Sequence, residues 1–551
     1  MADMKIGAYI CKGCGLGERL DTKQLANIAQ REGKAAVAKE HDFLCSAAGV
    51  EMIQNDINND GVNRIVIAAC SRRAKTEAFN FPGVAMSRAN IREGVIWSQP
   101  EGDESAETTQ EMADDYVRMG CAEVKKMKVP EGNPNRASNK RILVVGGGVS
   151  GMTAALEMAE AGYDTVLVEK SAALGGWASQ LVKRVPSMQP YADPADTGIA
   201  ELAARVGAHP RIKLHLNSTI AQTNGAPGRF AVDIAQESGA TVTEEVGALI
   251  QATGFTPYDM MKLPELGAGK SPNVVDQLGL EKLVKAANGG PVKRPSDGGE
   301  VKSVVFIQCA GQRDEAMESG GKHLPYCSGH CCATSIKQAM YFKDANPDID
   351  TMVMYTDLRV PGTGEDFYRS GQQKGITFTK GKTASVEAAG SDGKGACKVN
   401  FKDLILNEDV TVEADLVVLA TGMVANSGMN IDIPEEEVAK MEVKPISILN
   451  LNYRQGKDMP QLKSGFADSH FICFPYETRR TGIYAAGPVR RPMDMTQAVE
   501  DATGAAMKAI QAVENASLGR AAHPRAGDLS YPIVRLEGCT QCKRCTVECP
   551  F

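Results

Sequence analysis

The sequence predicts an α/β fold built around a Rossmann-type dinucleotide-binding unit. Apolar runs of strand length alternate with helical stretches from about residue 140 to about residue 515. One run, "RILVV", leads directly into a glycine-rich turn, and two later runs end in Ala-Thr-Gly. This alternation is typical of parallel sheets covered by helices, because each parallel crossover needs a connection of helical length.

The glycine-rich turn has the spacing of a phosphate-binding loop. Gly146, Gly148 and Gly151 follow the strand in G-x-G-x-x-G order, and a helical run and a second strand, "DTVLVEK", come next. Such glycines let backbone N–H groups approach a pyrophosphate, and an acidic residue at the end of the second strand accepts from ribose hydroxyls. We therefore predict a site that includes Glu169 and Lys170, with a merely structural turn as the alternative.

Further glycines and threonines follow other strands and extend the predicted cofactor site to Gly175, Gly176, Thr253, Gly254, Thr421, Gly422 and Gly487. The pattern over residues 140–515 resembles the FAD half of thioredoxin-reductase-like flavoproteins. That resemblance implies FAD as cofactor. In that family an acidic residue meets the flavin ribityl chain, but the expected position here is Pro488, and Asp494 is displaced from it.

Composition narrows the function classes. The net charge is −7, and basic residues are mixed with acidic ones, which argues against a nucleic-acid partner. No secretion signal or long apolar run is present, so we expect a cytoplasmic chain that contacts a membrane only through a partner. Fifteen cysteines in such a chain indicate metal ligation more than disulfides, and iron–sulfur clusters are held by thiolates.

A second nucleotide loop is missing where the FAD relatives carry one for NAD(P)H. The strand "SVVFIQCAGQRDE" ends at Cys309 without a glycine triplet, and Cys327, Cys331 and Cys332 follow. Four thiolates at a strand end and a helix start can surround one [4Fe–4S] cluster. The alternatives are core cysteines or a redox disulfide.

The segment "FIQCAGQRDE…PYCSGHCCATSIKQA" resembles the A subunit of heterodisulfide reductases and its relatives. The resemblance implies that these four cysteines hold a [4Fe–4S] cluster beside the flavin. Lys337, five residues after Cys332, is our candidate catalytic residue, because its ammonium could stabilise a reduced flavin. A solvated surface lysine is the other interpretation.

Both ends of the chain carry further cysteines. The C-terminal run "CTQCKRCTVECP" places Cys539, Cys542, Cys545 and Cys549 at the spacing of bacterial ferredoxins, which predicts a [4Fe–4S] site, and we expect the natural chain to continue. Near the N-terminus, Cys11, Cys14, Cys45 and Cys70 lie at strand ends or in nearby loops and resemble the same family's N-terminal domain. They are either ligands of another cluster or partly structural thiols.

We expect six segments. They are an N-terminal α/β domain with a possible Fe–S cluster (1–130), a linker (131–140), a first FAD part (141–300), a degenerate second nucleotide-type domain with a cluster (301–425), an FAD return (426–520) and the start of a ferredoxin-type domain (521–551).

The chain has no inserted C-x-x-C run between residues 255 and 300, and it opens with "KIGAYICKGCGLGERLD". In these two features it resembles the B subunit of the quinone-interacting membrane-bound oxidoreductase (Qmo) complex more closely than the heterodisulfide reductase A subunit. That resemblance implies an electron-transfer subunit that links the membrane quinone pool to adenylylsulfate reductase in sulfate reduction. Its implied partners are a second flavoprotein subunit together with a membrane haem subunit. Two alternatives remain, a non-redox scaffold with a relic flavin fold and a bifurcating flavoprotein of the heterodisulfide reductase A type.

Overall fold

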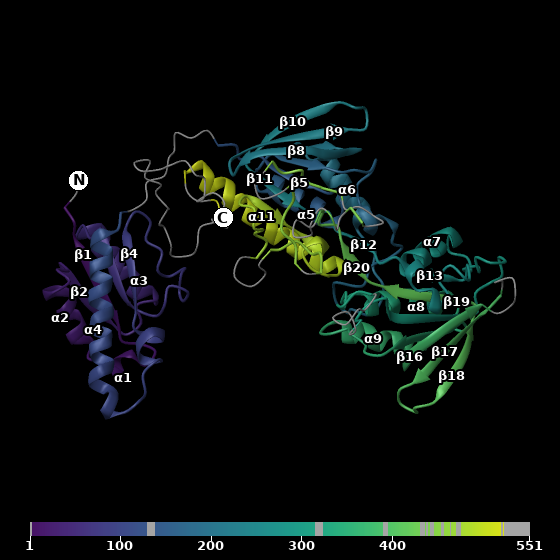
Figure 1. Ribbon diagram of the computed structural model, residues 1–551, viewed down its shortest axis with the longest axis horizontal. Helices are drawn as coiled ribbons and strands as arrows, with labels where there is room; N and C mark the ends of the chain where they lie inside the picture. The colour runs from purple at the N-terminus through teal and green to yellow at the C-terminus, as the bar shows by residue number, and fades with distance from the viewer. Residues whose placement is uncertain are drawn as a thin grey trace. The chain divides into compact units, whose positions relative to one another are not determined.

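The computed structural model describes residues 3–128, 138–314, 323–388, 395–429, 436, 439–440, 446–452, 457–462, 464–469, 475–519 and 522. The chain divides into two compact units, with the boundary between residues 133 and 134 (Figure 1). We call the N-terminal part unit 1 and the part from residue 138 to residue 518 unit 2.

Unit 1 is a parallel sheet with packed helices. Its strand order is β2-β1-β3-β4, with bounds Val37–His41, Ile6–Cys11, Arg64–Ala69 and Ala85–Asn90. Every residue of β1 is buried, which is typical of a central parallel strand covered on both faces. The helical elements are α1 (Leu16–Arg19), α2 (Thr22–Arg31), α3 (Ala47–Asn59), η1 (Arg92–Ile96) and α4 (Asp103–Lys126).

Local signals explain where the helices of unit 1 begin. The Asp21 side chain caps α2 by accepting from the N–H groups of Lys23 and Gln24. Helix α4 has acidic residues in its first turn and lysines in its last, an arrangement that complements the helix dipole. The apolar stretches "MKIGAYIC" and "VNRIVIAAC" form β1 and β3, and the helical stretch "TKQLANIAQREG" forms α2.

Unit 2 contains a five-stranded parallel sheet that we call the glycine sheet. Its order is β21-β11-β5-β6-β7, with bounds Ile483–Ala485, Ala248–Gln251, Ile142–Val145, Thr165–Val168 and Ile212–His215. Helices α5 (Val149–Glu160) and α11 (Met495–Ser517) pack against each other beside it, and α6 (Ile199–Ala208) also belongs here. An antiparallel sheet of β10, β9 and β8 follows in the chain (Thr241–Val246, Arg229–Gln236, Ser218–Ala226).

A second sheet of unit 2, the cysteine sheet, has the order β13-β19-β14-β15-β16-β17-β18. The bounds are Val274–Asp276, Leu416–Thr421, Ser303–Ala310, Asp350–Tyr355, Thr377–Ala388, Cys397–Asp403 and Asp409–Ala414. Strands β13 to β16 are parallel, and β16, β17 and β18 are antiparallel. Its helices are α7 (Gln277–Ala287), α8 (Cys331–Ala345) and α9 (Gly364–Gln373).

A short antiparallel pair joins the two sheets of unit 2. Strand β12 (Phe255–Pro257) leaves the glycine sheet and pairs with β20 (Met423–Ala425), which follows β19 of the cysteine sheet. The 3-10 turns are η2 (Gly176–Gln180), η3 (Met260–Lys262), η4 (Pro264–Leu266) and η6 (Gly487–Val489). The α/β class with Rossmann-type parallel sheets, as the sequence predicts, is therefore confirmed.

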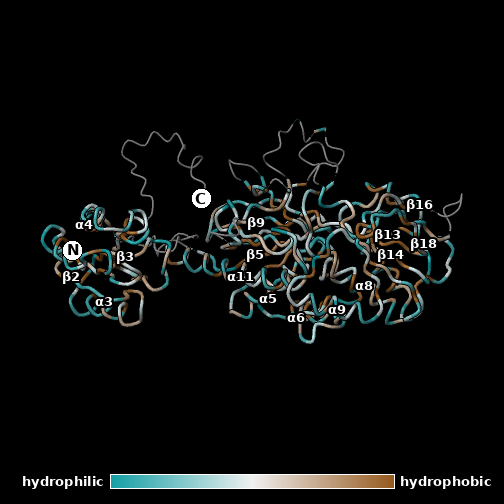
Figure 2. Tube along the Cα trace, turned by 90° about the horizontal axis from the view of Figure 1, so that it is seen from below, coloured by the Kyte–Doolittle hydropathy of each residue, from teal (hydrophilic) through white to brown (hydrophobic). Residues whose placement is uncertain are grey.

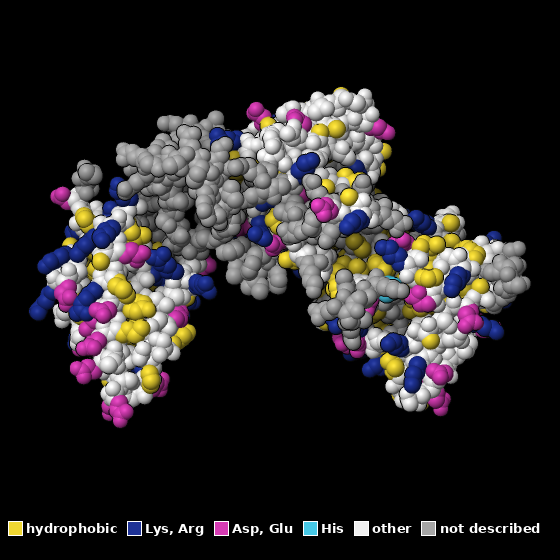
Figure 3. All heavy atoms as spheres, in the orientation of Figure 1, with side chains coloured by type: hydrophobic (Ala, Val, Ile, Leu, Met, Phe, Trp, Pro, Cys, Tyr) yellow, Lys and Arg dark blue, Asp and Glu magenta, His cyan; other side chains and the backbone are white. Residues whose placement is uncertain are grey.

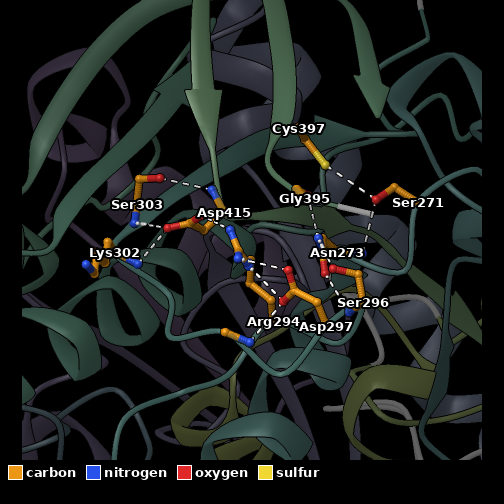
Figure 4. A network of polar contacts seen from close by, with 11 residues as sticks. Ser271, Asn273, Arg294, Ser296, Asp297, Lys302, Ser303, Gly395, Cys397 and Asp415 are labelled. Carbon is orange, nitrogen blue, oxygen red and sulfur yellow. Dashed lines mark hydrogen bonds and ion pairs between the residues drawn. The ribbon is translucent and has the colours of Figure 1, made fainter. Parts of the chain in front are cut away.

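A polar network ties the amino ends of the cysteine-sheet strands to the chain before them (Figure 4). Arg294 pairs with Asp297 and Asp415 at 2.9 and 2.7 Å, and Asp415 also accepts from the backbone of Ser303. The Cys397 thiol is fully buried and lies 3.5 Å from the Ser271 hydroxyl. This cysteine is thus occupied by packing and hydrogen bonding inside the fold.

The hydropathy of the residues changes between the strands and the periphery of the molecule. Figure 2 shows hydrophobic segments along strands such as β5, β13 and β14, inside a more hydrophilic periphery. On the face in Figure 3, Lys and Arg side chains are interspersed with Asp and Glu on both units, without a single-sign stripe. None of the helices in the described ranges is both long and apolar enough to cross a bilayer.

Candidate functional site

The glycine-rich turn follows β5 at the centre of the glycine sheet. Gly146 has φ +109°, and a Cβ added there would lie 2.5 Å from the carbonyl oxygen of Ala252. A Cβ on Gly151 would collide with the carbonyl oxygen of Gly146. Only glycine allows these close backbone approaches, so both residues are needed by the turn itself.

Gly148 differs, because nothing lies within 4 Å of a Cβ added there. It is the N-cap residue of α5, and no side chain caps the first-turn N–H groups of this helix. The loop is held in place by Gly175, whose N–H donates to the Gly147 carbonyl at 2.8 Å. Uncapped N–H groups facing open space at a helix N-terminus suit a pyrophosphate, so this turn fits a dinucleotide.

Glu169 lies directly after β6 and faces the same turn. Its carboxylate accepts from the Gly147 N–H at 2.6 Å and from the Ser171 N–H at 2.8 Å, and the residue is 7% exposed. A carboxylate has about four acceptor positions, so these two bonds orient it while leaving capacity for ribose hydroxyls. The neighbouring Lys170 is exposed.

The remaining predicted cofactor residues follow other strand ends. The Thr253 hydroxyl donates to the Asn426 carbonyl, which links the chain after β11 to the chain after β20. Gly487 follows β21 and packs so closely on Ser150 of α5 that a Cβ would clash. Gly176 and Gly254 have positive φ, Gly422 packs against Gln312 and Leu324, and Thr421 ends β19.

Asp494 takes a structural position. Its side chain caps α11 by accepting from the Gln497 N–H, and the Gln497 side chain accepts from the Asp494 N–H in return. This reciprocal capping gives the acidic residue at this position a structural role at the start of α11.

The structure brings Cys309, Cys327, Cys331 and Cys332 into one region at the carboxyl end of β14. Cys309 sits in an irregularity of that strand with φ +56°, while Cys331 and Cys332 are the first two residues of α8. Burial is the main cause of a raised pKa at Cys332, and the charges of Cys331, Cys309 and Cys327 raise it further. The four thiols are therefore close enough to affect each other's ionisation.

Each of these thiols has an N–H donor nearby. The sulfur of Cys309 lies 3.9 Å from an Arg313 guanidinium nitrogen, and the sulfur of Cys331 lies 3.4 Å from the Gln312 amide nitrogen. Backbone N–H groups of Gly329 and Arg359 lie 3.4 Å from the sulfurs of Cys327 and Cys332. Such donors favour the thiolate form and set the potential of a bound cluster.

Burial has the largest effect on the pKa values of Cys331 and Cys332. It raises the pKa of Cys331 to about 11 and that of Cys332 to about 12. Thiols with such values stay protonated at neutral pH, so a bound cluster must displace their protons.

No group of three or more His, Cys, Asp or Glu side chains in the described ranges is arranged around a single metal ion, and the described cysteines form no disulfide. A cubane differs from one ion because each thiolate binds a different iron, so its ligands stand further apart. Four neighbouring thiols with N–H donors at a helix N-terminus fit an anionic [4Fe–4S] cluster in donor type and number.

Lys337 is not a solvated surface lysine, so that interpretation is wrong. It is 2% exposed, and its ammonium lies 2.7 Å from a carboxylate oxygen of the fully buried Glu281 on α7. The ammonium also donates to the Lys183 carbonyl at 2.8 Å. Burial lowers the pKa of Lys337, and Glu281 opposes that change.

This ion pair connects residues 182 and 183, which follow the Gly175–Gly176 pair, to the helices of the cysteine sheet. Besides Lys337, Glu281 accepts from the Val182 N–H at 2.7 Å and from the Gln338 amide at 2.8 Å. Residues 182 and 183 follow η2, which begins at Gly176, so the network connects the predicted FAD loop with the helix that begins at Cys331. Sequence reasoning missed Glu281, because nothing in "LGLEKLVKA" separates it from an exposed helical glutamate.

Unit 1 holds a second group of thiols. Cys11 is buried, which raises its pKa, and the neighbouring Cys45 and Cys14 raise it further. Cys70 contacts arginine instead, with its sulfur 3.2 Å from a guanidinium nitrogen of Arg88. The structure thus groups Cys11, Cys14 and Cys45 by their mutual influence.

Cys70 is connected to that group through Arg92. The pKa of Arg92 is raised by its bond to Glu93 first, and a hydrogen bond with Cys14 and the charge of Cys70 contribute. Arg92 is therefore near both Cys14 and Cys70, and the set fits thiolate ligation with cationic support. The C-terminal Cys539, Cys542, Cys545 and Cys549 lie outside the described residues.

Comparison with known proteins agrees with this geometry. The model of the FAD dependent oxidoreductase family matches residues 141–251, which run from β5 to the end of β11. The iron-sulfur A subunit of a CoB–CoM heterodisulfide reductase of Methanopyrus kandleri is 29% identical over 99% of this chain and 90% of its own length. The chain is homologous to heterodisulfide reductase A subunits. It is therefore an oxidoreductase.

Other relatives are A subunits of the same class of enzyme. The A subunit of the H2:CoB-CoM heterodisulfide,ferredoxin reductase of Methanothermobacter marburgensis is 29% identical over all of this chain and 90% of its own length. The A subunit of a ferredoxin/F420H2-dependent CoB-CoM heterodisulfide reductase of Methanosarcina acetivorans is 28% identical over all of this chain and 75% of its own length.

The solved structures to which this chain is similar include two thioredoxin reductases. The T. acidophilum enzyme is 15% identical and covers 68% of this chain and 98% of its own, with a TM-score of 0.42. The Lactococcus lactis enzyme is 17% identical, covers 68% of this chain and all of its own, and has the same TM-score of 0.42.

Proposed function

We propose that this chain is an electron-transfer subunit of a heterodisulfide reductase-type complex, with FAD at the glycine turn and [4Fe–4S] clusters at the cysteine groups. One observation carries the proposal: four thiols with N–H donors lie at the end of β14, in the unit that also holds the phosphate-type turn. FAD exchanges one or two electrons and a cluster exchanges one, so the pair suits transfer between proteins.

The protein's own residues would bind and position these groups. Gly148 and the first turn of α5 would hold the pyrophosphate, Glu169 the ribose, and Cys309, Cys327, Cys331 and Cys332 the cluster. Lys337 would supply a buried positive charge that favours a negatively charged flavin, and Glu281 keeps that charge in place when the flavin is neutral. No acid–base residue for an organic substrate is required.

The thiols of unit 1 and the C-terminal run would hold further clusters. In unit 1, Arg88 and Arg92 beside Cys70 and Cys14 would offset the negative charge of such a cluster. The names of the relatives include a ferredoxin/F420H2-dependent reductase and an iron-sulfur subunit, which supports clusters and partner subunits here too.

A Qmo-type role is the second candidate, and one observation favours it. The alignment with the Methanopyrus kandleri relative spans 638 positions, whereas this chain has 551 residues, so that relative contains residues without a counterpart here. This difference is in keeping with the Qmo resemblance, which rests in part on the absence of an inserted C-x-x-C run between residues 255 and 300. In this version the partners are adenylylsulfate reductase, a second flavoprotein subunit, and also a membrane haem subunit. The chain would then be cytoplasmic and held at the membrane by its complex.

Anaerobic purification with flavin, iron and sulfide counts tests the main proposal. We expect bound FAD and iron with a matching amount of sulfide, and a colourless protein that binds neither after reconstitution would contradict it. Co-purifying subunits distinguish the candidates. Hydrogenase- or formate-dehydrogenase-type partners indicate the heterodisulfide reductase role, and a membrane haem subunit indicates the Qmo role.

A further inference from the structure

Gln308, next to Cys309 on β14, has a buried amide without a partner. The residue is 7% exposed, and neither its amide nitrogen nor its amide oxygen forms a hydrogen bond within the described part of the chain. A buried polar side chain is nearly always bonded, because its desolvation is otherwise uncompensated. This amide therefore indicates that a polar group is expected beside it.

The place of Gln308 follows from its position on β14. Val304 and Phe306 pack into the apolar cluster that contains Cys332 and Ile336 of α8, while Val305 and Ile307 pack into the core on the opposite face. Side chains alternate regularly only as far as Ile307, and Gln308 lies in the irregularity that follows, directly before Cys309, which is one of the four thiols. That position is the region of the four thiols.

A nearby amide shows what a satisfied glutamine looks like here. Gln312 donates to the Ala420 carbonyl at 3.1 Å, lies 3.4 Å from the Cys331 sulfur and accepts from the Ser328 N–H at 3.0 Å. Both of its polar atoms are engaged by the protein. Each thiol already has an N–H donor from another residue, and the inorganic sulfides of a bound cluster would be further acceptors beside Gln308.

We propose that Gln308 is a positioning residue whose amide N–H donates to a sulfide of the [4Fe–4S] cluster held by Cys309, Cys327, Cys331 and Cys332. This inference rests on the proposed function, since it requires the cluster. A donor to a cluster sulfur stabilises the reduced, more negative state and so raises the reduction potential. Gln308 would thus favour electron flow onto this cluster.

The test compares wild type with Gln308→Met, which has similar length but no donor. Potentials are measured in the full chain by redox titration followed by EPR, using the signal that Cys332→Ser abolishes. We expect Gln308→Met to retain its iron and to lower the potential by about 59 mV, a tenfold shift in the one-electron equilibrium. Asn273→Leu removes a fully buried amide of the Figure 4 network and should leave this potential unchanged.

Stability of the cluster-free protein gives a second, independent readout. There the Gln308 amide is unpaired, so Gln308→Met should melt at a higher temperature than wild type. Asn273→Leu should melt lower, because the Asn273 amide donates to Ser296 and to the Gly395 carbonyl. If Gln308→Met lowers the melting temperature of the cluster-free chain, the amide has a protein partner and the proposal is overturned.

The outcomes distinguish a failure of the proposed function from a failure of the role of Gln308. Wild type without a Cys332-dependent signal would contradict the proposed function. A normal signal whose potential is the same in Gln308→Met and wild type would overturn only the role of Gln308. If Gln308→Met does not fold, Gln308→Asn replaces it, since the shorter amide should lower the potential by a smaller amount, and an unchanged value would again overturn the role.

Discussion

The two parallel sheets of unit 2 have equivalent central strands with different endings. In the glycine sheet β5 lies between β11 and β6, and in the cysteine sheet β14 lies between β19 and β15. A Thr-Gly pair lies just after β11 and another at the end of β19, yet β5 leads into Gly146 and Cys309 lies in the last part of β14. The same place in the topology presents uncapped backbone N–H groups in one sheet and thiols in the other, and we propose a phosphate for the first and a metal cluster for the second.

The physical requirements of the two endings differ accordingly. A phosphate loop needs space and uncapped N–H groups, and Gly148 provides both. A cluster site needs soft ligands with N–H donors, and here these come from three separate segments of the chain, residues 309–313, residues 327–332 and Arg359. One site is local in sequence and the other is assembled by tertiary structure.

The largest effect is expected when one of the four proposed cluster ligands in the cysteine sheet is replaced. Cys332→Ser should remove about four irons per chain and leave FAD bound, because FAD belongs to the other sheet. Cys397→Ser is the matched control, since this buried cysteine bonds to Ser271 and should retain all the iron. Iron and flavin counts on anaerobic protein check this, and equal iron in both variants would contradict the cluster.

The next effect concerns the glycine end. Gly151→Ala should prevent correct folding of unit 2, because its Cβ would collide with the Gly146 carbonyl. Gly148→Ala should fold normally, since nothing surrounds the new Cβ, and bind FAD roughly tenfold or more weakly. Flavin titration with circular dichroism measures both, and unaltered FAD binding in Gly148→Ala would place the pyrophosphate elsewhere.

A third prediction concerns the Glu281–Lys337 ion pair that connects the two sheets. Glu281→Gln leaves the Lys337 ammonium buried without a counter-charge, so the free energy of unfolding should fall by about 3 kcal/mol. The double variant with Lys337→Met should recover part of that loss. Chemical denaturation of all three proteins provides the comparison.

The same variant should depend on pH in a defined direction. Burial lowers the pKa of Lys337, so the unfolded chain binds this proton more tightly and stability rises with pH through that interval. Without Glu281 the pKa falls further, so the deficit of the variant should be greatest near neutral pH and shrink toward about pH 10. A deficit that stays constant across this interval would mean that Lys337 is neutral in both folded proteins.

The smallest effect is expected at the other end of the cysteine sheet. Arg294→Ala breaks two partly exposed ion pairs with Asp297 and Asp415, and such pairs contribute about 1 kcal/mol or less. Cluster and flavin content should not change, because the network joins the amino ends of the strands (Figure 4). Iron loss in this variant would show that the two ends of the sheet are coupled.

Several parts of this molecule follow from sequence alone. The run from "RILVV" through Gly151 predicts β5, the turn and α5, because steric demands on glycine and helix spacing act over a few residues. The helix after Cys331 and the strand before Cys309 are likewise local. The grouping of thiols was only a hypothesis at that level, since cysteine spacing states which residues can be ligands but not which donors surround them.

Tertiary structure alone decided the rest. Glu281 and Lys337 meet although 56 positions separate them, and Arg359 reaches Cys332 from 27 positions away. Local preferences determined the strands, turns and helices, because they depend on backbone sterics and neighbouring side chains. Burial, ion pairing and the environment of each thiol depend on which distant segments the packed sheets bring together, and no short stretch of sequence contains that information.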